Sequence, residues 1–397
     1  MSGTAPSGQR WMVFQPEWTP WRRLLLLTLL LAVSPASGRW FGGEVGAQVT
    51  WQDFVVTGGV SAEGYQGNFP TASAVVRDST EIASAAVGEL GVRGALLWRR
   101  NGTVRGTVGF DGGVRQFAAR GFELRDFAPR EWSGTAEGTV FQPLGDVGTL
   151  SVFGRVRARD VEDRPPMPLF LQPGYLSWAA GAMTEVDLPG GRRIDFRVRA
   201  ERVEFYAPAL VPQVRLLDRD GAAVQIGYTE SFAGGNDLRI FGGVDGSRFP
   251  EQGTFEPEDP FRRDRTYSGG AVWSYRGNVL GQLGLEGRAN RSNSRRPEYN
   301  SMTVQGLLSV PVPGDAILTA FGALTLKGYL EPTPFARLIP GEEANNASLA
   351  YVSMGRAVAR NLDGTVRLGW TRAETEIGEN YFQRVGLSVL FHYRPGF

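Results

Sequence analysis

Strand-length stretches in which apolar and polar side chains alternate recur from about residue 44 to the end of the chain. In residues 150–159, Leu, Val, Gly, Val and Ala share one parity, and three arginines stand on the other. Residues 194–201 and 283–290 repeat the pattern. Successive side chains of a strand point to opposite faces. Each stretch therefore predicts a strand with one apolar and one charged face.

The connections between these stretches alternate between short and long. The short ones contain Asn-Gly, Gly-Asp, Asp-Gly or Gly-Gly steps, which supply the positive φ of tight hairpins. They lie at 100–102, 143–146, 189–191, 234–237, 275–278, 312–315 and 361–364. The long ones are polar, charged or proline-rich and lie at 66–82, 119–129, 161–174, 207–219, 249–265, 292–299 and 330–345. This alternation predicts an up-and-down meander with short turns at one end.

The meander contains about 16 predicted strands, an even number that places its two ends on the short-turn side. They are expected near 44–65, 84–99, 103–118, 130–142, 147–160, 175–188, 192–206, 220–232, 236–248, 266–276, 279–291, 299–311, 315–329, 346–359, 364–375 and 381–397. The first stretch changes parity near Asp53 and Phe54, which we interpret as a β-bulge. A hairpin there would change the count, so 14 or 18 strands remain alternatives.

The two faces favour a membrane barrel over a soluble sandwich. A meander of this length must close or leave edge strands exposed. Its apolar faces mix Val, Leu, Ala, Gly and Trp, its polar faces mix arginines with acids, and aromatic residues gather near strand ends. A membrane barrel requires this distribution, because lipid surrounds its outer face, water fills its interior and aromatic side chains gather at the membrane interfaces. We therefore expect an all-β, closed antiparallel up-and-down transmembrane β-barrel over residues 39–397.

The N-terminal segment has the pattern of a secretory signal peptide. Basic residues at Arg10, Arg22 and Arg23 precede a ten-residue apolar run, Leu24 to Val33, and the small residues of 34–38 follow. The run is shorter than the roughly 20 residues that cross a bilayer as a helix. We expect residues 1–38 to direct export and to be removed. The mature chain contains no cysteine, which excludes a disulfide framework.

The C-terminus carries a second signal. Val385, Leu387, Val389, Phe391 and Tyr393 share one parity. Phe397, the last residue, falls on the same parity. This ending resembles the C-terminal signature of bacterial outer-membrane proteins, although Pro395 departs from the usual apolar residue. The resemblance is to the porin-like class of Gram-negative outer-membrane barrels and identifies no subfamily.

The resemblance implies several partners. In the porin-like class the barrel-assembly machinery reads such an ending, so Val389, Phe391, Tyr393 and Phe397 form the expected assembly signal. Outer-membrane lipid surrounds barrels of this class, and many of them form trimers, which makes a homotrimer one candidate assembly. The nearly balanced charge, 42 Lys+Arg against 41 Asp+Glu, gives no basic excess for nucleic acid.

A barrel of about 16 strands encloses an aqueous channel unless it is plugged. The strand pattern begins within a few residues of the expected cleavage site, so we expect no N-terminal plug and exclude energy-coupled receptors. The main hypothesis is transport by passive diffusion of small hydrophilic solutes. Two expected groups of residues would line the pore: Arg155, Arg157, Arg159, Arg197 and Arg199 on strands, and Asp160, Glu162 and Asp163 at a third loop that folds inward. Alternatively, these charges only fill a solvated lumen as salt bridges.

The sequence offers little for catalysis or cofactors. The single histidine, His392, stands near Ser388 on one strand face, without an assignable third partner for a triad. No His/Cys cluster suggests a transition-metal site. We therefore expect neither enzymatic activity nor a cofactor. Two other functions remain open: a structural or surface-binding barrel with a self-occluded lumen and, less favoured, an outer-membrane hydrolase.

Overall fold

The computed structural model describes residues 47–67, 81–100, 103–120, 128–162, 174–206, 212–254, 258–294, 298–330, 348–374 and 381–395. All the strands belong to one compact unit, Gly46–Phe397. The first eight are β1 Ala47–Gly67, β2 Glu81–Arg100, β3 Thr103–Arg120, β4 Arg130–Pro143, β5 Gly148–Glu162, β6 Tyr175–Leu188, β7 Arg192–Phe205 and β8 Arg219–Phe232. The others are β9 Asn236–Gly253, β10 Phe261–Arg276, β11 Leu280–Ser292, β12 Tyr299–Val312, β13 Ala316–Tyr329, β14 Ser348–Ala359, β15 Leu362–Glu374 and β16 Tyr381–Tyr393.

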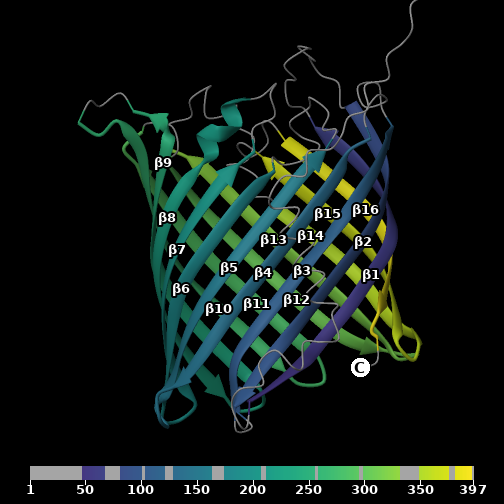
Figure 1. The fold of residues 1–397 in the computed structure, drawn as a ribbon, viewed down its shortest axis with the longest axis horizontal. Helices are drawn as coiled ribbons and strands as arrows, with labels where there is room; N and C mark the ends of the chain where they lie inside the picture. Colours follow the sequence, from purple (N-terminus) through teal and green to yellow (C-terminus); the bar gives the residue numbers. More distant parts are fainter. Residues whose placement is uncertain are drawn as a thin grey trace, which may run out of the picture. The chain divides into compact units, whose positions relative to one another are not determined.

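These strands form a closed barrel in which each strand pairs antiparallel with its neighbours in sequence (Figure 1). Closure comes from β1 and β16, which pair from Val56 opposite Tyr393 to Gly67 opposite Phe382. The predicted count of 16 is confirmed, and the alternatives of 14 and 18 are wrong. In lipid, an open edge would leave backbone groups unsatisfied at a cost of several kcal/mol each, so closure is what allows the sheet to span.

The predicted irregularity in the first strand is a β-bulge. The pairing of β1 with β2 shifts register between Trp51 and Asp53. Before the shift, Trp51 packs against Phe54 and Phe110 at centroid distances of 5.6 and 6.1 Å. The extra residue thus lets one strand keep large apolar side chains on a single face although its sequence changes parity.

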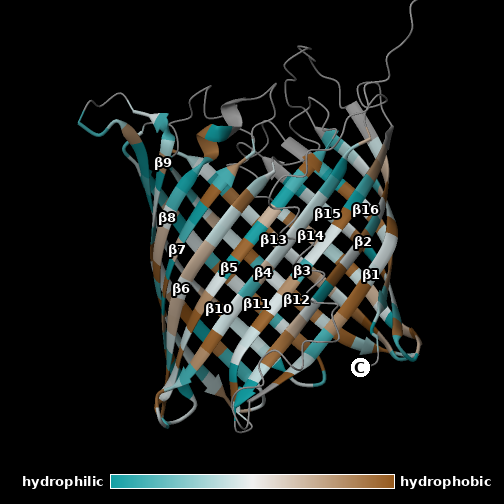
Figure 2. Ribbon diagram, viewed as in Figure 1, coloured by the Kyte–Doolittle hydropathy of each residue, from teal (hydrophilic) through white to brown (hydrophobic). Residues whose placement is uncertain are grey.

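The two faces of the sheet differ as the alternation predicts. Large apolar side chains of one parity are exposed on the outside, for example Val60 at 64%, Ile226 at 57% and Leu368 at 55%. Residues of the other parity point into the barrel. Figure 2 shows hydrophobic and hydrophilic positions alternating along the strands. Because lipid tails have no competing polar groups, such a surface suits the hydrocarbon region of a membrane.

The short turns confirm the expected turn chemistry at four sites. Gly145, Gly190, Gly191, Gly234, Gly235 and Gly314 have positive φ. At Gly235 a Cβ would overlap the carbonyl of Arg276 on the neighbouring β10–β11 turn, so only glycine fits. Gly277 and Gly364, in two other expected turns, are not among the positive-φ positions, and Gly364 lies inside β15.

The long-loop end differs from the sequence expectation in one place. Strand β10 begins at Phe261, five residues before the expected start at residue 266, and β9 continues to Gly253. The extension FRRDR has charge on both faces, and the lipid-facing pattern used to find strands therefore misses it. A 3-10 helix, η2 at Pro212–Leu217, lies in the connection from β7 to β8. None of the helices in the described residues has the length and apolarity to cross a membrane.

Candidate functional site

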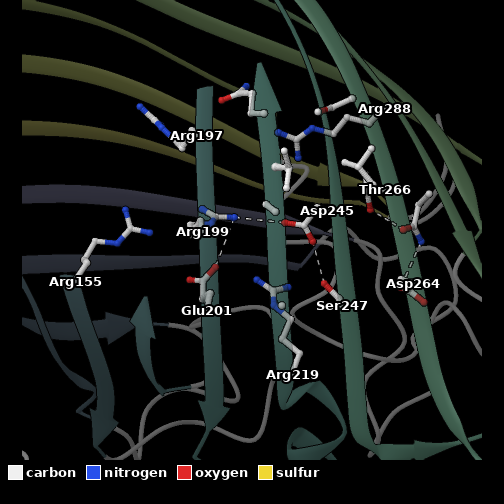
Figure 3. A pocket seen from close by; sticks show the side chains of 18 of the residues that line it. Arg155, Arg197, Arg199, Glu201, Arg219, Asp245, Ser247, Asp264, Thr266 and Arg288 are labelled. Atoms are coloured by element: carbon white, nitrogen blue, oxygen red, sulfur yellow. Dashed lines mark hydrogen bonds and ion pairs between the residues drawn. The ribbon is translucent and has the colours of Figure 1, made fainter. Parts of the chain in front are cut away.

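A cavity of about 960 Å³ lies inside the barrel and is lined by residues of β3 to β13 (Figure 3). Its wall includes eight cationic side chains and five carboxylates, a formal excess of three positive charges. The cations are Arg155, Arg157, Arg197, Arg199, Arg219, Arg262, Arg288 and Lys327, and the acids are Glu137, Glu201, Asp245, Asp264 and Glu286. The wall of this cavity is therefore polar, and its charge is not balanced.

Five of these cations form what we name the arginine wall: Arg155 and Arg157 on β5, Arg197 and Arg199 on β7, and Arg219 on β8. Their inward direction follows from parity, because Val156 and Val198 on the alternate positions are exposed outside. Arginine stays protonated in proteins, so this wall keeps its charge at any physiological pH. It is the largest concentration of one charge in the cavity.

The acids on the same side are held by specific partners. Arg199 lies 3.8 Å from Glu201 and 3.5 Å from Asp245. Ser177 donates a hydrogen bond of 3.0 Å to Glu201. Arg155 has a longer ion pair, 4.0 Å from its guanidinium to the carboxylate of Glu137. The acids thus neutralise Arg199 best and Arg155 weakly.

Asp195 is directed away from the arginine wall. Arg239 of β9 donates to both of its carboxylate oxygens, at 2.7 and 3.2 Å, across the intervening strand β8. This contact passes over Gly227, where a Cβ would overlap the Asp195 carboxylate and approach Arg239 to 2.7 Å. Arg197 instead donates to the thioether of Met183 at 3.1 Å. Within the described chain, Arg157, Arg197 and Arg219 have no carboxylate partner.

The opposite side of the barrel is lined by hydroxyl and aromatic groups. Strand β13 lies eight strands from β5 in either direction around the sheet. Thr303 bonds Thr325, and Ser309 bonds Thr319, each at 3.0 Å. We name these four residues and Thr365 of β15 the hydroxyl wall. The rings of Phe321 and Tyr351 stack beside it with centroids 5.4 Å apart.

One cation lies at the loop end of this side. Lys327, the only lysine of the chain, places its ammonium 4.1 Å and 4.4 Å from the ring centroids of Tyr299 and Tyr329. Both rings line the same cavity as the arginine wall. The aromatic faces stabilise the ammonium through their quadrupoles.

Two networks of ion pairs fix the inner wall near the long loops. In the first, Arg115 lies 2.5 Å from Glu63, 3.5 Å from Glu89 and 3.8 Å from Glu131. Arg159 continues this network at 3.0 Å from Glu131. It joins the inner faces of β1 to β5 and pairs these charges inside the barrel.

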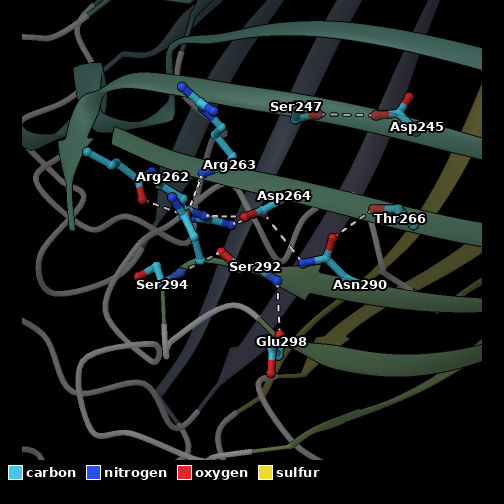
Figure 4. Close-up of polar contacts among 12 residues, drawn as sticks. Asp245, Ser247, Arg262, Arg263, Asp264, Thr266, Asn290, Ser292, Ser294 and Glu298 are labelled. Carbon is cyan, nitrogen blue, oxygen red and sulfur yellow. Dashed lines mark hydrogen bonds and ion pairs between the residues drawn. The ribbon is translucent and has the colours of Figure 1, made fainter. Parts of the chain in front are cut away.

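The second network lies on β9 to β11 (Figure 4). Arg262 donates to Asp264 at 3.0 and 2.5 Å and lies 4.1 Å from the centroid of Phe249. Arg262 also donates to Gln252 at 2.9 Å, and the Gln252 amide in turn donates to the carbonyl of Leu216 in η2. The network therefore ties the long connection after β7 to the barrel wall.

Two groups of this connection, Asp218 and Tyr206, have shifted pKa values. Burial raises the pKa of Asp218, although its carboxylate accepts a 2.6 Å hydrogen bond from the Phe205 backbone N–H. Burial, followed by the charges of Asp160 and Glu204, raises the pKa of Tyr206 to about 12. Both groups flank η2.

The structure places the expected pore residues in three groups. Arg155, Arg157, Arg197 and Arg199 line the cavity, whereas Arg159 belongs to the Glu131 network. Asp160 and Glu162 have the same parity as Val156, which is exposed on the outside, so this placement does not meet the expectation that they line the pore. Glu162 lies 4.0 Å from Arg130. Asp163 and the proposed inward fold of the third loop fall outside the described residues, as residues 163–173 do.

Sequence reasoning missed several lining residues. Arg219, Arg288 and Asp245 lie on β8, β11 and β9, which lack the closely repeated arginines that singled out β5 and β7. The signal that could have found them is parity alone: every polar residue alternating with exposed apolar ones on a strand belongs to the lumen.

The expected assembly signal lies on the outer face of β16 as far as it is described. Val389, Phe391 and Tyr393 are exposed there at 37%, 46% and 48%. Phe397 lies outside the described residues. On the inner face, His392 Nδ1 lies 3.0 Å from Thr57 Oγ1, and Ser388 donates to the Arg367 carbonyl at 3.4 Å. Among the described residues, no three His, Cys, Asp or Glu residues gather as a metal site would require.

Comparison with known proteins gives structural matches only. No family model and no curated protein matches the sequence. Solved structures with a similar fold include a bacterial polysaccharide outer-membrane secretin, at 9% identity and TM-score 0.39, covering 86% of this chain and 98% of that one. A BenF-like porin from Pseudomonas fluorescens Pf-5 matches at 11% identity and TM-score 0.38, covering 87% and 99%. The translocator domain of the autotransporter NalP from Neisseria meningitidis matches at 11% and 0.31, covering 94% and 96%.

Proposed function

We propose that this protein is a passive channel of a Gram-negative outer membrane that conducts small hydrophilic solutes and prefers anions. The observation that carries the proposal is the cavity of about 960 Å³ inside a closed barrel, lined by charged and hydroxyl side chains. An apolar core would have filled this space in a soluble barrel. Water and hydrated solutes fit a wall of this polarity.

The anion preference rests on the excess of three positive charges around the cavity. The arginine wall contributes most of that excess, and low-dielectric walls strengthen the field of charges that line a narrow space. A small anion entering the lumen is attracted by this field, and a cation is repelled. Neutral hydrophilic solutes pass according to size.

Export and assembly follow from the two ends of the chain. We assign residues 1–38 to a cleaved signal peptide and the outer face of the last strand, including Val389, Phe391 and Tyr393, to recognition by the barrel-assembly machinery. No catalytic role is assigned to any residue of the lumen.

Planar-bilayer recording tests the proposal. The mature chain, residues 39–397, is refolded in detergent and added to one side of a membrane bathed in potassium chloride. We expect stepwise conductance and, in a salt gradient, a reversal potential displaced toward the chloride equilibrium potential. The same preparation after boiling is the control, because it contains the chain without the barrel.

Two results would overturn the proposal. Correctly folded barrels that insert without any conductance would support the self-occluded structural barrel instead. Conductance with a clear cation preference would retain the channel but refute the role given to the arginine wall.

A further inference from the structure

The outer face of β9 to β11 carries a cluster of four arginines toward the long loops. Alternate positions on these strands are exposed on the outside, as Val244 at 45%, Tyr267 at 49% and Leu285 at 49% demonstrate. Toward the long loops the same parity continues as Arg248 on β9, Arg263 and Arg265 on β10, and Arg291 on β11. We name these four residues the outer arginine patch.

Pairing brings these charges directly against each other. Arg248 is the cross-strand partner of Arg263, and Arg265 is the cross-strand partner of Arg291. Like charges at directly opposite positions of an antiparallel pair destabilise the sheet. Two such pairs side by side therefore require compensation from somewhere.

The protein supplies only part of that compensation. Arg263 lies 3.3 Å from Asp259, and Arg291 donates to the neutral oxygens of Asn290, Tyr299 and Asn300. Asp220, the cross-strand neighbour of Arg248, instead lies 3.7 Å from Arg202 of β7.

The remaining two guanidinium groups, of Arg248 and Arg265, form no ion pair with a described acid. Arg248 lies 5.2 Å above the Phe261 ring. Within the part of the chain that the structure describes, Arg248 and Arg265 have no carboxylate partner. Among the described residues, two positive charges on the outer face thus remain without an anion.

The position of the outer arginine patch along the barrel indicates what kind of anion could pair with it. Arg265 lies two residues beyond Tyr267 on the same face, about 7 Å along the strand at 3.4 Å per residue. Tyrosines of the outer face mark the membrane interface in this architecture. The patch therefore lies at headgroup level on the long-loop side, which faces the cell exterior.

We propose that the outer arginine patch binds the phosphate-bearing headgroup of an anionic lipid in the outer leaflet. Guanidinium groups recognise phosphate by paired hydrogen bonds. The acyl chains of the same lipid lie along the apolar residues below, such as Tyr267 and Val244. One lipid thereby supplies both the anion that the arginines lack and the apolar contact that the strands need.

Native mass spectrometry of the folded barrel in detergent tests the proposal. Phosphatidylglycerol and phosphatidylcholine are titrated separately, and we expect the anionic lipid to bind more tightly. The variant Arg248→Gln with Arg265→Gln should weaken phosphatidylglycerol binding by about fivefold for each arginine removed. Sodium phosphate alone should not compete at equal concentration, because it has no acyl chains.

A matched control removes the same charge from the same face at the other end. Arg192 and Arg356 also have the outward parity but lie near the short turns. Arg192→Gln with Arg356→Gln should leave phosphatidylglycerol binding within twofold of the wild type. Heat-dependent gel mobility checks that each variant is folded.

Three outcomes would overturn the proposal. Equal loss of binding in both variants would mean that lipid binding depends on the total charge of the barrel and not on the outer arginine patch. Equal affinity for phosphatidylglycerol and phosphatidylcholine would remove the role of the headgroup charge. Equal competition by sodium phosphate would show a site for a free anion rather than for a lipid.

Discussion

The arginine wall and the hydroxyl wall face each other across one lumen and present different chemistry to the water between them. On the arginine wall, the inner positions of β5 and β7 carry charges that need nearby acids. On the inner positions of β12 to β14, Lys327 is the only charge among the described residues, and hydroxyl pairs satisfy one another. Both sides are hydrophilic, but only one of them generates a strong field.

This difference has a consequence for what crosses the pore. A field between a wall with many charges and a wall with few acts across the lumen and orients dipolar solutes, whereas a ring of evenly spread charge would not. Because of this asymmetry, we expect the stability of the barrel and the ion selectivity of the pore to depend on different walls. Changes on the hydroxyl wall should alter local packing, and changes on the arginine wall should alter which ions pass.

The largest expected effect comes from removing two charges of the arginine wall. Arg155→Ala with Arg157→Ala should shift the reversal potential in a salt gradient toward cations, with a several-fold change in permeability ratio. The reason is that Arg155 is only weakly neutralised by Glu137, 4.0 Å away, and Arg157 has no carboxylate among the described residues. Planar-bilayer recordings measure the shift.

The hydroxyl wall provides the matched variant. Thr303→Val with Thr319→Val replaces two hydroxyl groups by methyl groups. The side-chain volumes stay nearly the same, and no charge is removed. We expect its permeability ratio to equal that of the wild type. A comparable shift in both variants would mean that pore shape, and not the charge asymmetry, determines selectivity.

The sequence predicts much of this comparison because parity is a strong constraint. Alternation locates the strands and assigns Arg155, Arg157, Arg197 and Arg199 to the inner face. The same rule, applied past the middle of β5, would have placed Asp160 and Glu162 outside with Val156. The expectation failed there because β5 continues to Glu162, so these two acids belong to the strand and not to the third loop.

The choice of ion-pair partners could not be predicted. Asp195 pairs with Arg239 two strands away, and not with Arg193 or Arg197 beside it on β7. That choice depends on the register of β7, β8 and β9 and on the space left above Gly227. Register in a barrel is set by closure of the whole sheet, which no single stretch of sequence encodes.

A smaller effect, on stability, comes from glycines on the two sides. Gly227→Ala should destabilise the barrel by about 1–3 kcal/mol, because the added Cβ overlaps the Asp195–Arg239 ion pair and over-packs a fixed contact. Urea unfolding in lipid vesicles, followed by tryptophan fluorescence, measures the change.

Gly355 is the corresponding glycine on the opposite side, where a Cβ would meet Thr365 Oγ1 at 3.4 Å and the Gly364 carbonyl at 4.0 Å, both ordinary contacts. Gly355→Ala should be neutral or stabilise by up to about 1 kcal/mol, because it restricts the unfolded chain without a clash. Equal destabilisation by the two substitutions would mean that the charged side is no more tightly constrained than the neutral one.

The smallest expected effect concerns Lys327, the one described charge on the inner face of β12 to β14. Lys327→Gln should shift permeability toward cations, but less than either arginine of β5 replaced alone. Its ammonium is held against Tyr299 and Tyr329 near the loop end of β13, whereas Arg155 and Arg157 lie farther inside the barrel. Recordings in the same salt gradient compare the three single variants.

Lys327→Arg, which keeps the charge, should behave as the wild type, and a shift with that variant would assign the effect to the tyrosine contacts. A shift for Lys327→Gln as large as that of Arg157→Gln would place the selective field at the entrance, and the contrast between the two walls would then no longer explain selectivity.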